Sequence, residues 1–137
     1  MKTLKNYLIL IIGLLMTITM TGCDDKEEVE YNLPGTWYTA QNIDFGVYTW
    51  GEGTVMQFNS SHQGTIGTAT DNDFLVFEWN WLNEGYNVME LYFYTDNSYA
   101  YIVGADASYN TFSGTWYNNY ADFSNRRNGQ RFIMRRQ

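Results

Sequence analysis

The chain has 137 residues, of which 45% are hydrophobic and 18% aromatic, with a single Pro, a composition that supports a packed core and excludes a disordered chain. Its net charge of −7 disfavours nucleic acid as a partner, because the phosphate backbone would be repelled. A single cysteine excludes an internal disulfide, so core packing must hold the fold together.

The N-terminal segment has the layout of a bacterial lipoprotein signal peptide. Lys2 and Lys5 precede an apolar stretch, 7–20, which is shorter than the roughly 20 residues that a transmembrane anchor, the alternative, would need. Met20-Thr21-Gly22-Cys23 then resembles a lipobox. We therefore expect residues 1–22 to be cleaved off and Cys23 to be diacylated, which holds a protein stably on a membrane. A catalytic or metal-binding role for Cys23 would need a nearby His or a second Cys, and the chain has only His62.

Residues 23–32 follow as a charged run without apolar periodicity, which predicts a flexible, solvated acidic tether behind the lipidated cysteine. After cleavage, six basic and fifteen acidic residues remain, a net charge of −9. An acidic stretch directly after the cysteine resembles the surface-export signal of Bacteroidetes-type lipoproteins, which implies the outer face of the outer membrane. A plain spacer on the periplasmic face is the alternative.

From Tyr31 onward the pattern changes from charge to alternation. Phe77, Trp79 and Trp81 share one face of an extended segment, and Glu78 and Asn80 share the other, a period of two that is typical of a strand. The segment 89–94 repeats this pattern, and Asn83-Glu84-Gly85 between the two has the composition of a hairpin turn, with a glycine able to take positive φ.

The same pattern predicts eight strands, at 37–41, 54–59, 64–70, 74–82, 86–94, 98–103, 111–117 and 130–135. Asn128-Gly129 is the strongest hairpin signal, and a turn of helix is possible only around 43–48. The predicted domain, 33–137, is all-β: a small antiparallel up-and-down barrel of about eight strands, with a sandwich as the alternative. Closure is favoured because it removes exposed sheet edges.

Seven different short motifs lie along this domain: Leu33-Pro34-Gly35-Thr36-Trp37, Met56-Gln57-Phe58-Asn59, Gly64-Thr65-Ile66-Gly67, Phe77-Glu78-Trp79, Glu90-Leu91-Tyr92, Phe112-Ser113-Gly114 and Phe132-Ile133-Met134-Arg135. Together they resemble the lipocalin-like domains of small Bacteroidetes-type surface lipoproteins, over nearly all of 33–136. The resemblance implies a calycin-like barrel.

The sequence contains none of the common catalytic motifs considered below. One histidine, His62, is too few for the common zinc sites, and its surroundings predict an exposed hairpin loop. No Gly-x-Ser-x-Gly motif marks a serine nucleophile, and the spacing of Glu78, Glu90 and Asp96 does not place two carboxylates across a cleft. We therefore expect no enzyme, no metal and no cofactor.

Binding is better supported, because 12 tyrosines cannot all be interior in a domain this small, and exposed aromatic rings stack on sugars or anchor interfaces. The alternative is that they form cross-strand pairs on the outer wall. The candidate ligand-binding residues are Trp79, Trp81, Tyr92, Tyr94, Tyr101, Arg131 and Arg135.

Arginine forks suit phosphates or carboxylates, such as those of lipid A or uronic acids. For Arg131 and Arg135, however, structural pairing with a neighbouring acidic strip is the favoured interpretation. The predicted function is a membrane-anchored, non-catalytic binding lipoprotein of the bacterial envelope, whose ligand is a glycan or a small apolar molecule. The alternative is a protein-interaction module, an inhibitor or an assembly partner of an envelope complex.

Overall fold

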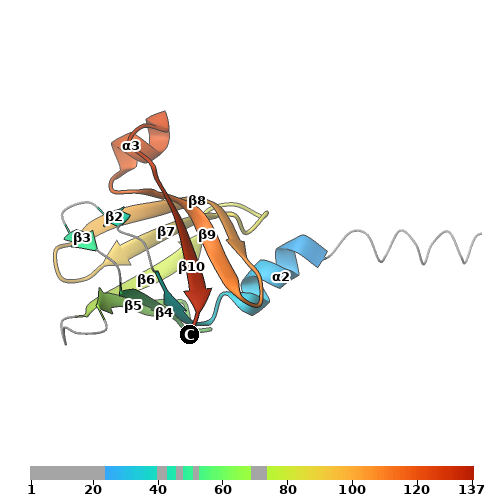
Figure 1. The fold of residues 1–137 in the computed structure, drawn as a ribbon. Coiled ribbons are helices and arrows are strands. Elements are labelled where there is room, and N and C mark those ends of the chain that lie inside the picture. Colours follow the sequence, from blue (N-terminus) through green and yellow to red (C-terminus); the bar gives the residue numbers. More distant parts are fainter. Residues whose placement is uncertain (1–23, 40–42, 46–47, 51–52, 69–73) are drawn as a thin grey trace, which may run out of the picture.

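The computed structural model describes residues 24–39, 43–45, 48–50, 53–68 and 74–137. Eight antiparallel strands close into a barrel, which confirms the predicted fold class (Figure 1). Each strand overlaps one of the eight predicted segments. The strands are β1 (Gly35–Tyr38), β4 (Thr54–Phe58), β5 (Gln63–Thr68), β6 (Leu75–Trp81), β7 (Val88–Phe93), β8 (Ser98–Ala107), β9 (Thr111–Tyr117) and β10 (Gln130–Arg136).

Strands β4 to β10 form an up-and-down meander, and β1 closes it into a barrel. Strands β4 to β10 each pair with the next along the chain, and β1 lies between β10 and β4. In this register Trp37 is opposite Arg136 on one side and Met56 on the other. Continuous pairing around the ring excludes the sandwich alternative.

A second, two-stranded sheet joins β1 to β4. It consists of β2 (Ile43–Phe45) and β3 (Tyr48–Trp50), paired antiparallel with Ile43 opposite Trp50. The turn of helix considered around 43–48 is therefore wrong for these residues. Ile, Phe, Tyr and Trp are strand-favouring residues, which accounts for the difference.

Side chains fill the barrel interior, as the alternation predicts. Phe58 is the centre of this packing: its ring centroid lies 5.4 Å from that of Phe77, 5.9 Å from Trp79 and 5.4 Å from Phe112. All four residues are buried. Gly64 makes room for them, because a Cβ at this position would lie 2.5 Å from the Phe77 ring. The interior is thus a packed aromatic core.

Two helices lie at opposite ends of the barrel (Figure 1). Helix α3 (Tyr120–Asn125) precedes β10, and helix α2 (Asp24–Asn32) lies where β10 ends, since the Arg136 guanidinium donates to the Asn32 carbonyl oxygen. Among the helices in the described part of the chain, none is long and apolar enough to cross a membrane.

Helix α2 corrects the prediction of a flexible tether over 23–32. Its C-terminal half packs on the barrel, because Val29 of the helix and Leu33, which directly follows it, are buried. The Asn32 amide donates to the Ala107 carbonyl oxygen at 3.4 Å, and the Trp37 indole donates to the Leu33 carbonyl oxygen at 2.8 Å. Two apolar residues four positions apart make one buried stripe. Two apolar residues are too few to give a recognisable helical period in an otherwise charged segment.

Two turns also differ in detail from expectation. The turn at 83–85 does connect β6 to β7, but the positive φ, 51°, belongs to Tyr86 and not to Gly85. Asn128-Gly129 is not a two-residue hairpin, because α3 lies within the connection from β9 to β10. Asn128 does take positive φ, at 56°, and its side chain donates to Asp122 at the start of α3.

Candidate functional site

Three tyrosines meet on the outer wall of the barrel. Tyr92 on β7 is directly opposite Tyr99 on β8, and its ring centroid lies 5.0 Å from that of Tyr99 and 5.3 Å from that of Tyr94. Tyr94 and Tyr99 are 48% and 45% exposed. We call these three residues the tyrosine face. It contains two of the predicted ligand-binding residues and adds Tyr99.

Polar partners hold the tyrosine face in place. The Tyr92 hydroxyl donates to Asn97 Oδ1 at 2.6 Å, and the Tyr94 hydroxyl donates to Glu78 Oε2 at 3.1 Å. Partial desolvation, then the hydrogen bond and the charge of Glu78, raise the pKa of Tyr94. Among the described residues, none donates to the second oxygen of Glu78. The rings are thus fixed beside a carboxylate with acceptor capacity left.

Tyr101, a predicted ligand-binding residue, is covered by α3. Its ring stacks on that of Phe123, with centroids 4.4 Å apart and planes 14° apart, and it is only 4% exposed. Burial, and then the nearby Glu90 carboxylate, raise the pKa of Tyr101 to about 12. This tyrosine therefore attaches α3 to the wall and is not open to a ligand.

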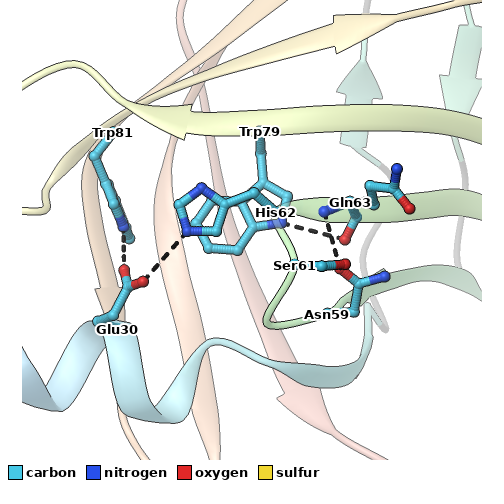
Figure 2. A network of polar contacts seen from close by, with 7 residues as sticks. All are labelled: Glu30, Asn59, Ser61, His62, Gln63, Trp79 and Trp81. Atoms are coloured by element: carbon cyan, nitrogen blue, oxygen red, sulfur yellow. Dashed lines mark hydrogen bonds and ion pairs between the residues drawn. The ribbon is translucent and has the colours of Figure 1, made fainter.

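Trp79, another predicted ligand-binding residue, belongs to the core. It is buried, and its indole donates to the Gln63 carbonyl oxygen at 3.2 Å. The His62 imidazole stacks on it, with centroids 4.1 Å apart and planes 19° apart (Figure 2). His62 does lie in the β4–β5 loop, as predicted, but this stacking leaves its side chain only 36% exposed.

Trp81 and His62 both bind Glu30 of α2 (Figure 2). The Trp81 indole donates to Glu30 Oε2, while His62 Nε2 lies 3.4 Å from Glu30 Oε1. One helix carboxylate thus contacts two parts of the barrel, the end of β6 and the β4–β5 loop. Trp81, a predicted binding residue, uses its only donor in this contact.

A pocket of about 470 Å³ lies at this end of the barrel, lined by Glu30, Tyr31, Pro34, Ser60, Trp79 and Tyr86. We call it the rim pocket. Sequence reasoning missed Glu30 and Tyr31, because their segment was interpreted as tether. Tyr86 was counted only among the surplus of tyrosines and was placed at the start of the predicted strand 86–94, whereas β7 begins at Val88.

The two predicted arginine residues lie apart from both surfaces. Arg131 and Arg135 are exposed on β10, opposite Thr115 and Thr111 of β9. Between the side chains that the structure describes, neither arginine makes an ion pair, and the pairing with an acidic strip stays a prediction. Strand β9 separates them from the strand that carries Tyr99.

The described residues hold no group of three or more His, Cys, Asp or Glu side chains that could bind a metal ion. Glu78 and Glu90 both belong to the outer wall, where their register partners are aromatic or amide residues. Cys23, the predicted lipidation site, lies outside the described residues.

Comparisons of this chain with protein-family models, with curated proteins and with solved structures found no match.

Proposed function

We propose that this chain is a membrane-anchored, non-catalytic binding lipoprotein of the bacterial cell envelope, and that its barrel binds a glycan through the tyrosine face. The observation that carries this proposal is the cluster of Tyr92, Tyr94 and Tyr99: the Tyr92 ring lies 5.3 Å from that of Tyr94 and 5.0 Å from that of Tyr99, and the latter two residues are nearly half exposed. A lipocalin-like family, as the sequence motifs suggest, is consistent with it.

The chemistry of the tyrosine face suits a sugar. Tyrosine rings present flat apolar faces to the C–H faces of a pyranose, at a low cost in side-chain entropy. Glu78 and Asn97 place acceptor oxygens at the edge of the cluster, where sugar hydroxyls can donate. Because the Tyr92 and Tyr94 hydroxyls already have partners, these two rings lose little further freedom on binding.

The packed core favours the outer wall over the barrel interior as the binding site. Phe58, Phe77, Trp79 and Phe112 occupy the space in which a small apolar ligand would have to lie. An apolar ligand of ordinary size needs about 300 Å³ or more. We therefore favour the glycan over the small apolar ligand.

The proposal of a lipid anchor at Cys23 is based on the sequence alone. A charged start, a short apolar stretch and Met20-Thr21-Gly22-Cys23 support cleavage before Cys23 and its diacylation. The acidic residues that follow favour the outer face of the outer membrane, with the periplasmic face as the alternative. Replacing Cys23 with Ser should abolish incorporation of labelled palmitate and release the protein from membranes; unchanged membrane retention would argue against a lipid anchor.

Glycan binding is tested with the mature lipoprotein in detergent micelles, screened against envelope and host glycans and then titrated calorimetrically. The double variant Tyr94→Ala/Tyr99→Ala should weaken binding by at least about tenfold, since each stacked ring is worth about 1 kcal/mol. Tyr109→Ala is the matched control, because Tyr109 is 74% exposed but lies in the β8–β9 turn.

The same variants distinguish the protein-interaction alternative. A stoichiometric protein partner in pull-downs from envelope extracts, lost with the double variant and accompanied by no glycan binding, would favour that alternative. If the screen finds no glycan at millimolar concentration and pull-downs find no partner, the tyrosine face is not a binding surface, and its rings serve only the cross-strand packing of the wall.

A further inference from the structure

The rim pocket has the size and the lining of a small-molecule site. Its volume, about 470 Å³, is within the range of roughly 300 to 1,000 Å³ that ligand pockets occupy. Three aromatic residues and a proline form most of its wall, and the Ser60 hydroxyl and the Glu30 carboxylate are the polar side-chain groups. Aromatic walls with a few placed polar groups are typical of binding sites.

The charge of the pocket is negative. Of the described residues that line it, Glu30 alone is charged. The neighbouring depression on the other side of Tyr86 is lined by Glu28 and Asp106 among others, again without a basic residue. Arg136 approaches α2, but its guanidinium donates to the carbonyl oxygens of Asn32 and Pro34 and lies over the Trp37 ring. Among the described side chains, the one ion-pair contact of Glu30 is with His62 Nε2, at 3.4 Å.

The Glu30 carboxylate is oriented and retains acceptor capacity. Trp81 donates to Oε2, which fixes the rotamer of the side chain. The other oxygen, Oε1, lies 3.4 Å from His62 Nε2, longer than the 2.7 to 3.2 Å usual for an N–H···O hydrogen bond. A ligand cation near Oε1 would therefore find an acceptor that His62 does not saturate.

We infer that the rim pocket binds a small organic cation, with its ammonium group against Glu30 and the rings of Tyr31 and Tyr86. Aromatic faces attract cations through the ring quadrupole, and a carboxylate adds direct charge pairing. Tyr31 is 84% exposed and so is free to close on a ligand. This site is independent of the tyrosine face and of the lipid anchor, and it exists only because α2 packs on the barrel.

The test compares two probes of the same shape, choline and its neutral isostere 3,3-dimethyl-1-butanol, on the mature lipoprotein in detergent micelles. The indole N–H of Trp81 is the reporter, because it donates to Glu30 and gives a resolvable signal in a proton–nitrogen correlation spectrum. We expect choline to shift this signal saturably with a millimolar dissociation constant, and the isostere to bind at least about tenfold more weakly.

Two variants assign the effect to the pocket. Glu30→Gln keeps an oxygen for the Trp81 indole but removes the charge, so the preference for choline should disappear. Tyr31→Leu is the second variant: this side chain is largely exposed, so the change leaves the fold intact and should still weaken choline binding severalfold. Glu84→Gln, at an exposed carboxylate of the β6–β7 loop, is the matched control and should bind like wild type.

Equal shifts with both probes, or choline binding that survives both Glu30→Gln and Tyr31→Leu, would overturn the inference. So would the absence of any saturable shift at the Trp81 indole. Glycan binding measured in parallel separates this site from the proposed function: rim-pocket variants should leave glycan affinity unchanged, and the Tyr94→Ala/Tyr99→Ala variant should leave choline binding unchanged.

Discussion

His62 shows how much of a residue's role depends on distant sequence. Its loop position follows from the local composition, and the structure agrees. Its two partners do not follow, because Trp79 is 17 positions away on β6 and Glu30 lies 32 positions earlier. No local pattern pairs a loop histidine with a carboxylate in a segment that lacks periodicity. The rim pocket could not be predicted for the same reason.

The predicted ligand-binding tyrosines all occupy outward-facing strand positions, but they differ in whether another element covers them. Tyr92 and Tyr94 stay on an open wall, whereas Tyr101 is covered by Phe123 of α3. Alternation identifies the face of a sheet to which a side chain belongs, but not what later packs on that face. Helix α3 has six residues, too few to show a helical stripe.

Tyr101 should make the protein sensitive to alkaline pH. Its pKa in the folded state is raised to about 12, while in the unfolded chain it is about 10. The folded state holds the proton more tightly, so this contribution to stability is present below about pH 10 and is lost as pH rises towards about 12. Thermal melts should show a smaller alkaline loss for Tyr101→Phe than for wild type, and Tyr109→Phe should behave like wild type.

Gly64 should tolerate no side chain. A Cβ there would lie 2.4 Å from the Gln57 carbonyl oxygen and 2.5 Å from the Phe77 ring, so Gly64→Ala forces the two strands or the core apart. We expect a loss of about 1 to 3 kcal/mol in chemical denaturation. Gly85→Ala is the control, since its Cβ would meet nothing closer than 3.4 Å. Equal stability of both variants would mean that β5 can move away from Phe77 without loss.

Among the helices and strands, the barrel strands could be predicted from the sequence. Each barrel strand carries its own alternation, for example Phe77, Trp79 and Trp81 in β6, and such a pattern can be recognised without knowing the partner strand. Helix α2 was missed because its position is fixed by tertiary contacts of Val29 and Leu33, not by its own sequence. The two-stranded β2–β3 sheet was missed because three-residue strands are too short to establish a period.

Helix α2 should behave as part of the folded domain. Val29→Asp places a charge where the wild-type side chain is 8% exposed, so the helix should detach and the segment before β1 should become sensitive to limited proteolysis. Tyr31→Asp, two residues along the same helix but 84% exposed in wild type, is the matched control and should stay resistant. Rapid cleavage of wild type within 28–33 would instead restore the interpretation as a flexible tether.

The barrel interior is a packed core and does not enclose a ligand cavity among the described residues. Phe58 contacts rings from three directions, so Phe58→Ala should remove about 3 to 5 kcal/mol of stability, as for other large aromatic truncations in packed interiors. Ile133→Ala, 41% exposed on the outer face of β10, should cost less than about 1 kcal/mol. Denaturation in urea measures both. A loss of similar size at both positions would indicate a loosely filled interior.

The position of β1 between β10 and β4 sets when this barrel can form. The strand nearest the N-terminus pairs with the strand nearest the C-terminus, and Arg136 reaches the Pro34 and Asn32 carbonyl oxygens to complete that junction. During synthesis β1 and β4 therefore emerge well before β10, and the ring cannot close until β10 has emerged. Contacts of such long sequence separation make folding slow, and open strand edges invite aggregation.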